Sequence, residues 1–356
     1  MIKLKHFTEL DGIRAIAALM VMFFHFFHEL VTSNPTLILV KKFAFIGQTG
    51  VSLFFVLSGF LITRILLNTK HTDGFFTNFY VRRALRIFPL YYLFLIIFYF
   101  LIPVIENTEF VPFGQQIYFW VYLQNFAITF NWNWNGPQHF WSLAVEEHFY
   151  FIWPLIIYYL DKKRIKLAIY SLILLAFLIR LIMVINHIEV FYFTFCRMDE
   201  LAVGALLAVW EVNGKLDNYK PNNFIKMAAV LLIPTLGLWI LTSGMGLDVV
   251  QVIKFILLAF CYFCFIGFAI TTNENHWLKR FLQNRFFSYT GKISYGLYVY
   301  HPLCFWFVNT HLQLNSIIIS FMVSFAFCFL IASASFYLFE SKFLSFKNKF
   351  NYNTIS

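Results

Sequence analysis

An arginine and a histidine near the N-terminus have the spacing of residues that could act on one substrate. Arg14 follows Asp11 and is separated from His25 by ten apolar residues. Eleven positions at ~100° each complete about three helical turns, so the two side chains share one helix face about 16 Å apart. Such a pair is costly inside an apolar helix and usually serves a substrate, an ion or a proton path. The simpler alternative is that Arg14 snorkels to the headgroups and His25 hydrogen-bonds to a neighbouring helix.

A second group of ionisable residues lies at the start of another apolar run. Trp141 and Ser142 are followed by Glu146 and Glu147. Adjacent helical positions differ by ~100° in direction, so we expect only one of the two carboxylates to face the interior. That carboxylate could orient the His25 ring and raise its basicity, as an acid does beside a catalytic imidazole.

Three arginines, Arg82, Arg83 and Arg86, lie where a further apolar run begins. Arg83 and Arg86 are three positions apart and project from one side of a helix. Guanidinium groups bind phosphates through two parallel hydrogen bonds, which makes these two arginines candidates for a phosphate site. An ordinary positively charged anchor at the inner membrane surface is the alternative.

Polar residues in other apolar runs could serve the chemistry or hold helices together. Ser58 precedes a glycine in a segment that permits close helix approach. Arg197 and Asp199 precede a run of small residues, and an internal ion pair is the simpler interpretation. Arg180 lies near the outer end of its span, where it could snorkel or meet an anionic acceptor.

A tyrosine and a histidine share a late apolar run. Tyr298 and His301 are followed by Pro302, which frees a backbone carbonyl and can bend a helix around a cavity. A structural role for a buried histidine is the alternative.

The composition places this chemistry in a membrane. Of the 356 residues, 60% are hydrophobic and 12% are charged, and the mean hydropathy is +0.71. A soluble domain could not cover so much apolar surface, so we expect an all-α polytopic membrane protein. The net charge of +10 suits loops against anionic lipid better than nucleic acid, because the basic residues cluster between apolar runs. We expect one membrane domain over residues 1–356, with a core at about 7–343, no added soluble domain and no cleavable signal peptide.

Ten apolar runs are expected to cross the bilayer. They are Gly12–Leu30, Ala44–Leu67, Ile87–Ile105, Phe140–Leu160, Leu167–Asn186, Met198–Val212, Ile225–Ser243, Val249–Thr271, Ile293–Val308 and Ile317–Phe339. The run Ile117–Phe130 is interpreted as a re-entrant or interfacial segment, because counting it as a crossing would move the later basic loops outside. The same rule predicts a plasma-membrane protein with both termini cytoplasmic, with Lys41 and Lys42 as outer exceptions.

The cysteines are expected to pack in the core. Cys261 and Cys264 have CxxC spacing, but they lie within a continuous apolar run without a second pair or nearby histidines. No metal-ligand set and no nucleotide-binding motif appears elsewhere in the sequence.

Six stretches, taken together and in order, resemble the integral-membrane acyltransferase 3 family. They are Leu10–Arg14 with His25, Val51–Phe60, Arg83–Arg86, Trp141–Glu146, Arg197–Gly204 and Ser294–His301. The resemblance implies about ten transmembrane helices and transfer of an acyl group, commonly acetyl, from cytoplasmic acyl-CoA to a hydroxyl of a cell-surface or secreted glycan. Further implied partners are membrane lipids, a lipid-linked saccharide acceptor and a separate acceptor-selecting protein.

The resemblance also implies roles for individual residues. By position, His25 is similar to the family's catalytic histidine, and Glu146 to its acidic position. Arg14, Arg83 and Arg86 are similar to acyl-CoA contacts. The supporting residues are Asp11, Ser58, Trp141, Ser142, Arg197, Asp199, Tyr298 and His301. The chain departs from the family pattern after Glu340, where a proline is often found, and we therefore give Glu340 no role.

The expected mechanism uses His25 as a general base on the acceptor hydroxyl, with Glu146 or His301 stabilising the imidazole. An acyl-histidine intermediate is an alternative that the sequence does not separate from direct transfer. The rival class is a proton-coupled secondary transporter of an anionic solute, in which Arg14, His25 and Glu146 would form the pathway.

Overall fold

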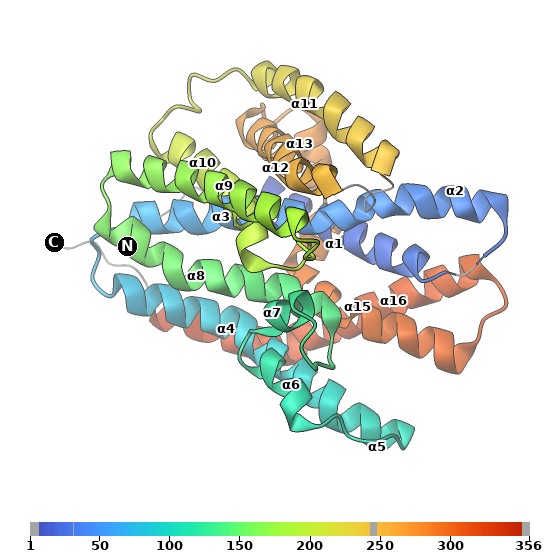
Figure 1. Ribbon diagram of the computed structural model, residues 1–356. Helices are drawn as coiled ribbons and strands as arrows, with labels where there is room; N and C mark the ends of the chain where they lie inside the picture. Colours follow the sequence, from blue (N-terminus) through green and yellow to red (C-terminus); the bar gives the residue numbers. More distant parts are fainter. Residues whose placement is uncertain (1–6, 31, 243–247, 351–356) are drawn as a thin grey trace.

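The structure is a computed structural model that describes residues 7–30, 32–242 and 248–350. In these ranges every regular element is helical, and the long helices run side by side as a bundle (Figure 1). Six helical runs of the described chain are long and apolar enough to cross a bilayer, which confirms the expected all-α polytopic membrane protein. These runs are Glu9–His28, Pro35–Thr69, Phe75–Glu106, Lys162–Ile185, Val250–Thr271 and Ile317–Lys349.

The helices follow one another with short connections; η marks a 3₁₀ or π helix. The first part of the chain contains α1 (Glu9–His28), α2 (Pro35–Ala44), η1 (Phe45–Thr49), α3 (Gly50–Thr69), α4 (Phe75–Ile96), η2 (Ile97–Leu101), α5 (Ile102–Glu106), α6 (Phe113–Trp120), α7 (Gln124–Thr129), η3 (Gln138–Phe140) and α8 (Trp141–Tyr159). The second part contains α9 (Lys162–Ile185), α10 (Thr194–Val212), α11 (Pro221–Thr242), α12 (Asp248–Thr271), α13 (Trp277–Leu282), α14 (Arg285–Lys292), α15 (Ser294–Phe307), η4 (Val308–Leu312), α16 (Ile317–Ser335), η5 (Phe336–Glu340), α17 (Ser341–Ser345) and η6 (Phe346–Lys349).

The other four expected spans correspond to α8, α10, α11 and α15. α8 and α10 carry several acidic and basic side chains, which lower their hydropathy, and α15 has only 14 residues. The count of ten crossings therefore stays a prediction. The run Ile117–Phe130 forms the end of α6 and all of α7, which have 8 and 6 residues. A crossing helix needs about 20 residues, so this arrangement agrees with a re-entrant or interfacial segment.

The described chain begins and ends at the same end of the bundle (Figure 1). Phe7 lies under the guanidinium of Arg64, near the end of α3. The carbonyl of Phe350 accepts a hydrogen bond from Arg82, near the start of α4. Because α3 and α4 are joined by a short connection, both chain ends are close to this turn. An even number of crossings follows if every crossing is complete.

α3 is the central helix of the bundle, and it packs against α1, α8, α10 and α12. Its closest neighbour is α10, and two glycines allow the approach. A Cβ on Gly59 would lie 1.9 Å from the carbonyl oxygen of Leu201, and a Cβ on Gly204 would lie 2.0 Å from that of Val56. Small residues let membrane helices pack with their backbones in contact. The close approach brings the polar residues of both helices into one layer.

Gly204→Ala should destabilise the protein by about 1–3 kcal/mol, because the added methyl group forces α10 away from α3. Gly237→Ala is the matched control, since no atom in the described part of the chain lies within 4 Å of a Cβ at that position of α11. The measurement is the midpoint of thermal denaturation in detergent. Equal midpoints for the two variants would contradict the close α3–α10 contact.

Candidate active site

A cavity of about 110 Å³ contains the arginines that the sequence singled out. Arg14 from α1 and Arg83 and Arg86 from α4 line this inner cavity together with residues of α3, α8 and α15. Asp11 holds the Arg14 guanidinium at 2.5 Å. The Arg83 guanidinium lies 5.6 Å from the centre of the Tyr150 ring. Three cations from two helices separated in sequence therefore surround one space.

Both carboxylates of α8 line the inner cavity, so the expectation that only one faces the interior is wrong. The cavity extends around more than one face of α8 and accepts both side chains. The hydroxyls of Ser58 and Tyr150 hydrogen-bond to each other, and both lie at the Glu146 carboxylate, which can accept from either. Glu146 also lies in the electrostatic field of Arg83 and Arg86. The carboxylate is thus held among the cationic groups.

A larger cavity, of about 590 Å³, contains His25. His28, Glu29 and Gln138 line it at exposed positions, which places its opening at the surface. Much of the remaining wall of this outer cavity is aromatic, and its rings belong to Phe24, Phe94, Phe98, Trp141, Phe191, Tyr192 and Trp306. This wall combines broad apolar faces with a few polar groups, as sites for small organic ligands do.

Three histidines meet beside the outer cavity. The rings of His25 and His301 are 4.8 Å apart between centres, and those of His139 and His301 are 5.4 Å apart. His25 Nδ1 lies 2.9 Å from the carbonyl oxygen of Val21. A carbonyl oxygen only accepts, so Nδ1 carries the proton of the neutral ring and Nε2 keeps a lone pair. The lone pair of the neutral His25 ring is therefore on Nε2.

His301 is fully buried and has the same arrangement. Its Nδ1 lies 2.8 Å from the carbonyl oxygen of Tyr298, while no hydrogen-bond partner of Nε2 is found among the described residues. Within these contacts the His25 ring is oriented by the Val21 carbonyl, whereas Glu146 lies in the other cavity. Of the two residues expected to stabilise the imidazole, His301 rather than Glu146 is in contact with the His25 ring.

Two residues, Val51 and Tyr298, line both cavities and separate them. Tyr298 donates a hydrogen bond of 2.7 Å to the carbonyl oxygen of His139. Ser142 Oγ lies 2.5 Å from the same phenol oxygen. Arg14 and His25 share a helix face as predicted, but Arg14 lines the inner cavity and His25 the outer one.

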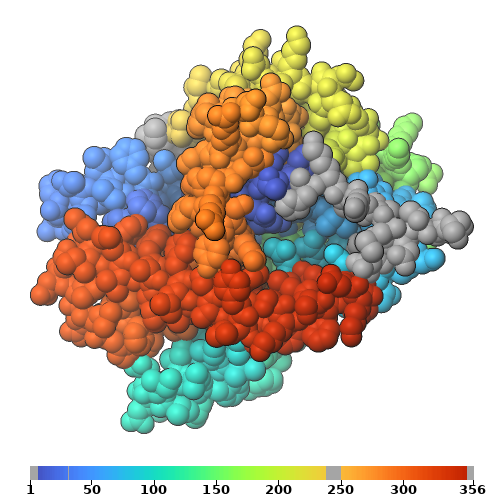
Figure 2. Space-filling view, turned by 180° about the vertical axis from the view of Figure 1, so that it is seen from behind, coloured from blue at the N-terminus to red at the C-terminus, as the bar shows by residue number. Residues whose placement is uncertain are grey.

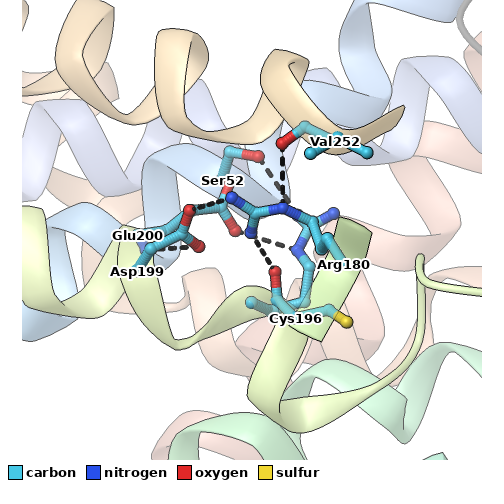
Figure 3. A network of polar contacts seen from close by, with 7 residues as sticks. Ser52, Arg180, Cys196, Asp199, Glu200 and Val252 are labelled. Atoms are coloured by element: carbon cyan, nitrogen blue, oxygen red, sulfur yellow. Dashed lines mark hydrogen bonds and ion pairs between the residues drawn. The ribbon is translucent and has the colours of Figure 1, made fainter. Parts of the chain in front are cut away.

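Arg197 and Asp199 lie outside both cavities and belong to a buried ion network, shown in Figure 3. Asp199 accepts from Arg180 at 2.6 Å, and Glu200 accepts from Arg197 at 2.9 Å. Arg197 also donates to Ser52 of α3 at 3.2 Å. The simpler interpretation of this motif, an internal ion pair, thus describes its geometry.

The expectation for Arg180 is wrong, because its side chain is fully buried and neither snorkels nor meets solvent. Besides Asp199, it donates to the carbonyls of Val252 on α12 and Cys196 on α10. The sequence signal that could have indicated this ion pair is the acidic residue Asp199, 19 positions later.

Arg197 supports the wall of the outer cavity from behind. Its guanidinium lies 5.4 Å from the ring centre of Trp141 and 5.1 Å from that of Phe191. Cation–π contacts of this kind are strengthened when water is excluded. The network therefore holds two rings of the outer cavity as well as the helices.

Sequence reasoning missed several lining residues. Tyr150 of the inner cavity and Tyr192, Gln48 and Glu29 of the outer cavity carried no distinct signal, because aromatic and polar residues are common at membrane interfaces. Tyr150 lies four positions after Glu146 on the same helix face, and that spacing could have indicated it.

Comparison with known proteins agrees with the resemblance seen in the sequence. The family model described as an acyltransferase domain matches residues 7–339. A Staphylococcus aureus protein provisionally named an O-acetyltransferase is 25% identical over 344 residues, covering 87% of this chain and 52% of that protein. No solved structure matches the chain significantly.

Two further relatives have names that include an acceptor. Peptidoglycan O-acetyltransferase OatA of Listeria monocytogenes is 28% identical over 321 residues, covering 83% of this chain and 49% of OatA. A Bacillus subtilis protein provisionally named peptidoglycan O-acetyltransferase YrhL is 33% identical over 243 residues, covering 61% of this chain and 36% of that protein. The chain spans about half the length, or less, of these curated relatives.

Arg180→Gln should lower the stability of the protein by about 3–5 kcal/mol, because it leaves the buried Asp199 carboxylate without its cation. Arg164→Gln on the same helix is the matched control: its ion pair with Asp161 is 3.6 Å long and exposed, and we expect no measurable change. Thermal denaturation of the solubilised protein measures both. Similar midpoints for the two variants would refute a supporting role for the network.

Proposed function

The chain belongs to the acyltransferase 3 family of membrane proteins, and on that premise we propose that it transfers an acetyl group from acyl-CoA to a hydroxyl group of a cell-envelope glycan. Peptidoglycan is the acceptor suggested by the names of two relatives. Family membership favours this activity over the transporter that the sequence alone left open.

One observation carries the proposal: an arginine-lined cavity and a histidine-containing cavity adjoin at Val51 and Tyr298. A transfer between two compartments needs a donor site on one side, an acceptor site on the other and a base where they meet. The two cavities supply these three features along α1.

The inner cavity is proposed as the donor site. Guanidinium groups hold phosphates in fixed directions, and CoA carries a diphosphate and a 3′-phosphate on its nucleotide. Arg14, Arg83 and Arg86 would bind this end while the narrow pantetheine arm extends toward Tyr298. Because CoA is cytoplasmic, this assignment places the arginine end and both termini in the cytoplasm of a cell with the protein in its plasma membrane.

The outer cavity is proposed as the acceptor site. Sugar rings present apolar C–H faces that pack on aromatic side chains, and Trp141, Tyr192 and Trp306 offer such faces. Both Gln138 and Glu29 are at exposed positions. The Gln138 amide would donate hydrogen bonds to sugar hydroxyls or accept from them, and the Glu29 carboxylate would accept from them. The acceptor hydroxyl would then approach His25 from the outer side.

The chemical step is direct transfer with His25 as general base. Nε2 of His25 removes the proton of the acceptor hydroxyl as its oxygen attacks the thioester carbonyl carbon. The carbon–sulfur bond breaks, the acyl group stays on the acceptor oxygen, and the histidine returns the proton to the CoA thiolate. The Val21 carbonyl keeps the proton of the neutral ring on Nδ1, and His301 lies beside the charged imidazolium during the step.

Glu146 has a role on the donor side in this proposal. It lies among Arg83, Arg86, Ser58 and Tyr150, so its charge and hydrogen bonds would keep these groups in place around the pantetheine arm. Trp141 and Ser142 would support the junction of the two cavities. Arg197 and Asp199 would support the acceptor wall from behind.

His25→Asn should lower acetyl transfer from radiolabelled acetyl-CoA to purified envelope glycan by at least about 100-fold, because a general base typically contributes 10²- to 10⁴-fold. His311→Asn is the control, since that histidine pairs with Glu106 away from both cavities. CoA affinity should be unchanged in both variants. A His25→Asn rate within tenfold of the parent protein would exclude the general-base role.

Arg83→Ala with Arg86→Ala should weaken CoA binding by at least about tenfold, because hydrogen bonds to charged groups contribute roughly 1.5–3 kcal/mol each. Arg280→Ala, which removes an exposed arginine bonded to Asn275, is the control. Isothermal titration in detergent gives the dissociation constants. Unchanged affinity in the double variant would remove the inner cavity as the donor site.

A further inference from the structure

The C-terminal segment lies on the helix that carries the arginines of the inner cavity. The family match ends at residue 339, within η5, and the chain continues through α17 and η6. All three elements pack against α4. Figure 2 shows this C-terminal run, in red, on the surface of the bundle. A part of the chain outside the matched domain therefore borders the donor end of the site.

Arg82 fastens this segment to α4. Its Nη1 donates hydrogen bonds of 3.0 Å to the carbonyl oxygens of Lys347 and Phe350. Lys347 lies within η6, where its carbonyl also accepts from the backbone N–H of Phe350, and Phe350 directly follows η6. The two bonds hold the backbone of Lys347 against Arg82, which directly precedes Arg83 in α4.

The surroundings of Lys347 are cationic. The side chain is half-buried, and the four charged groups that act on it most strongly are Arg86, Arg83, Arg82 and Arg14. Like charges repel one another, and the carboxylates beside these arginines include Asp11 at Arg14, and Glu146 and Glu340 near Arg86. Lys349, two positions later, is exposed and lies over the ring of Phe346 instead.

We propose that Lys347 is a further donor-binding residue, which contacts the 3′-phosphate of the CoA nucleotide outside the inner cavity. Lys347 does not line that cavity, whereas Arg14, Arg83 and Arg86 do. When the diphosphate contacts the arginines and the pantetheine arm extends toward Tyr298, the nucleotide end remains on the cytoplasmic side of the arginines, next to η6. The inference rests on the proposed function for its ligand and adds a contact from outside the family domain.

The experiment compares CoA with dephospho-CoA, which lacks only the 3′-phosphate. Dissociation constants are measured by titration of the full chain in neutral-lipid nanodiscs. The parent protein should bind CoA about threefold to tenfold more tightly than dephospho-CoA, as expected for a partly exposed charged contact. Lys347→Gln should reduce this ratio to near one. Lys349→Gln, the matched control, and Lys347→Arg, which keeps the charge, should preserve it.

The outcomes separate this inference from the proposed function. If the parent protein binds neither CoA nor dephospho-CoA, the proposal that CoA is the donor and the proposed Lys347 contact are both refuted. If it binds CoA and Lys347→Gln keeps the parent ratio, the donor stands and Lys347 is excluded as a contact. Nanodiscs with phosphatidylglycerol test a lipid headgroup as the anion. The proposal would also be overturned if Lys347→Gln removed a stabilisation of the protein by phosphatidylglycerol but left the ratio of CoA to dephospho-CoA affinity unchanged.

Discussion

Charged side chains enclosed by an apolar bundle are the constraint on which the rest of the structure depends. Hydrocarbon offers no water to a guanidinium or a carboxylate, so each charge needs partners from the protein or a place at a cavity. Arg180 and Arg197 have their partners within the bundle: their contacts with Asp199, Glu200 and Ser52, and those of Arg180 with backbone carbonyls, join α3, α9, α10 and α12. These contacts, with the glycine-mediated approach of α3 and α10, form the frame of the molecule.

The frame explains where chemistry is possible. With α10 held against α3, the other sides of α3 face α1 and α8, and the cavities lie there. Arg197 connects the two regions, because the same guanidinium that pairs with Glu200 also lies against Trp141 and Phe191. Removing an ion pair of the frame would therefore disturb the aromatic wall even though no frame residue lines a cavity. The ion network therefore supports the outer cavity through the packing of Arg197 against these two rings.

Several features were predictable because they depend on local periodicity. The common helix face of Arg14 and His25 follows from their spacing, and the helical membrane class follows from composition. The sequence did not predict that Arg14 and His25 line different cavities, because the residues between these cavities, Val51 and Tyr298, come from other helices that are distant in sequence. Arg180 was misplaced for the same reason: its partner is on another helix, and a single span does not reveal which faces are buried. The two glutamates of α8 show that a cavity can be wider than one helix face.

The sizes of the two cavities bear on the direction of transfer. The arginine-lined cavity has about 110 Å³ and the histidine-containing cavity about 590 Å³. Under the proposed function, the smaller space would take the thin thioester arm and the larger one the broader sugar chain. Tyr298 stands between them, and its hydroxyl is bonded to the His139 carbonyl and to Ser142, so a thioester that reached His25 in the proposed reaction would pass this side chain. Both bonds end at or near α8, and neither involves the ion pairs of α10. Under the proposed function, the division of the shared α1 face would therefore keep the donor phosphates and the acceptor hydroxyl in separate cavities that adjoin at Val51 and Tyr298.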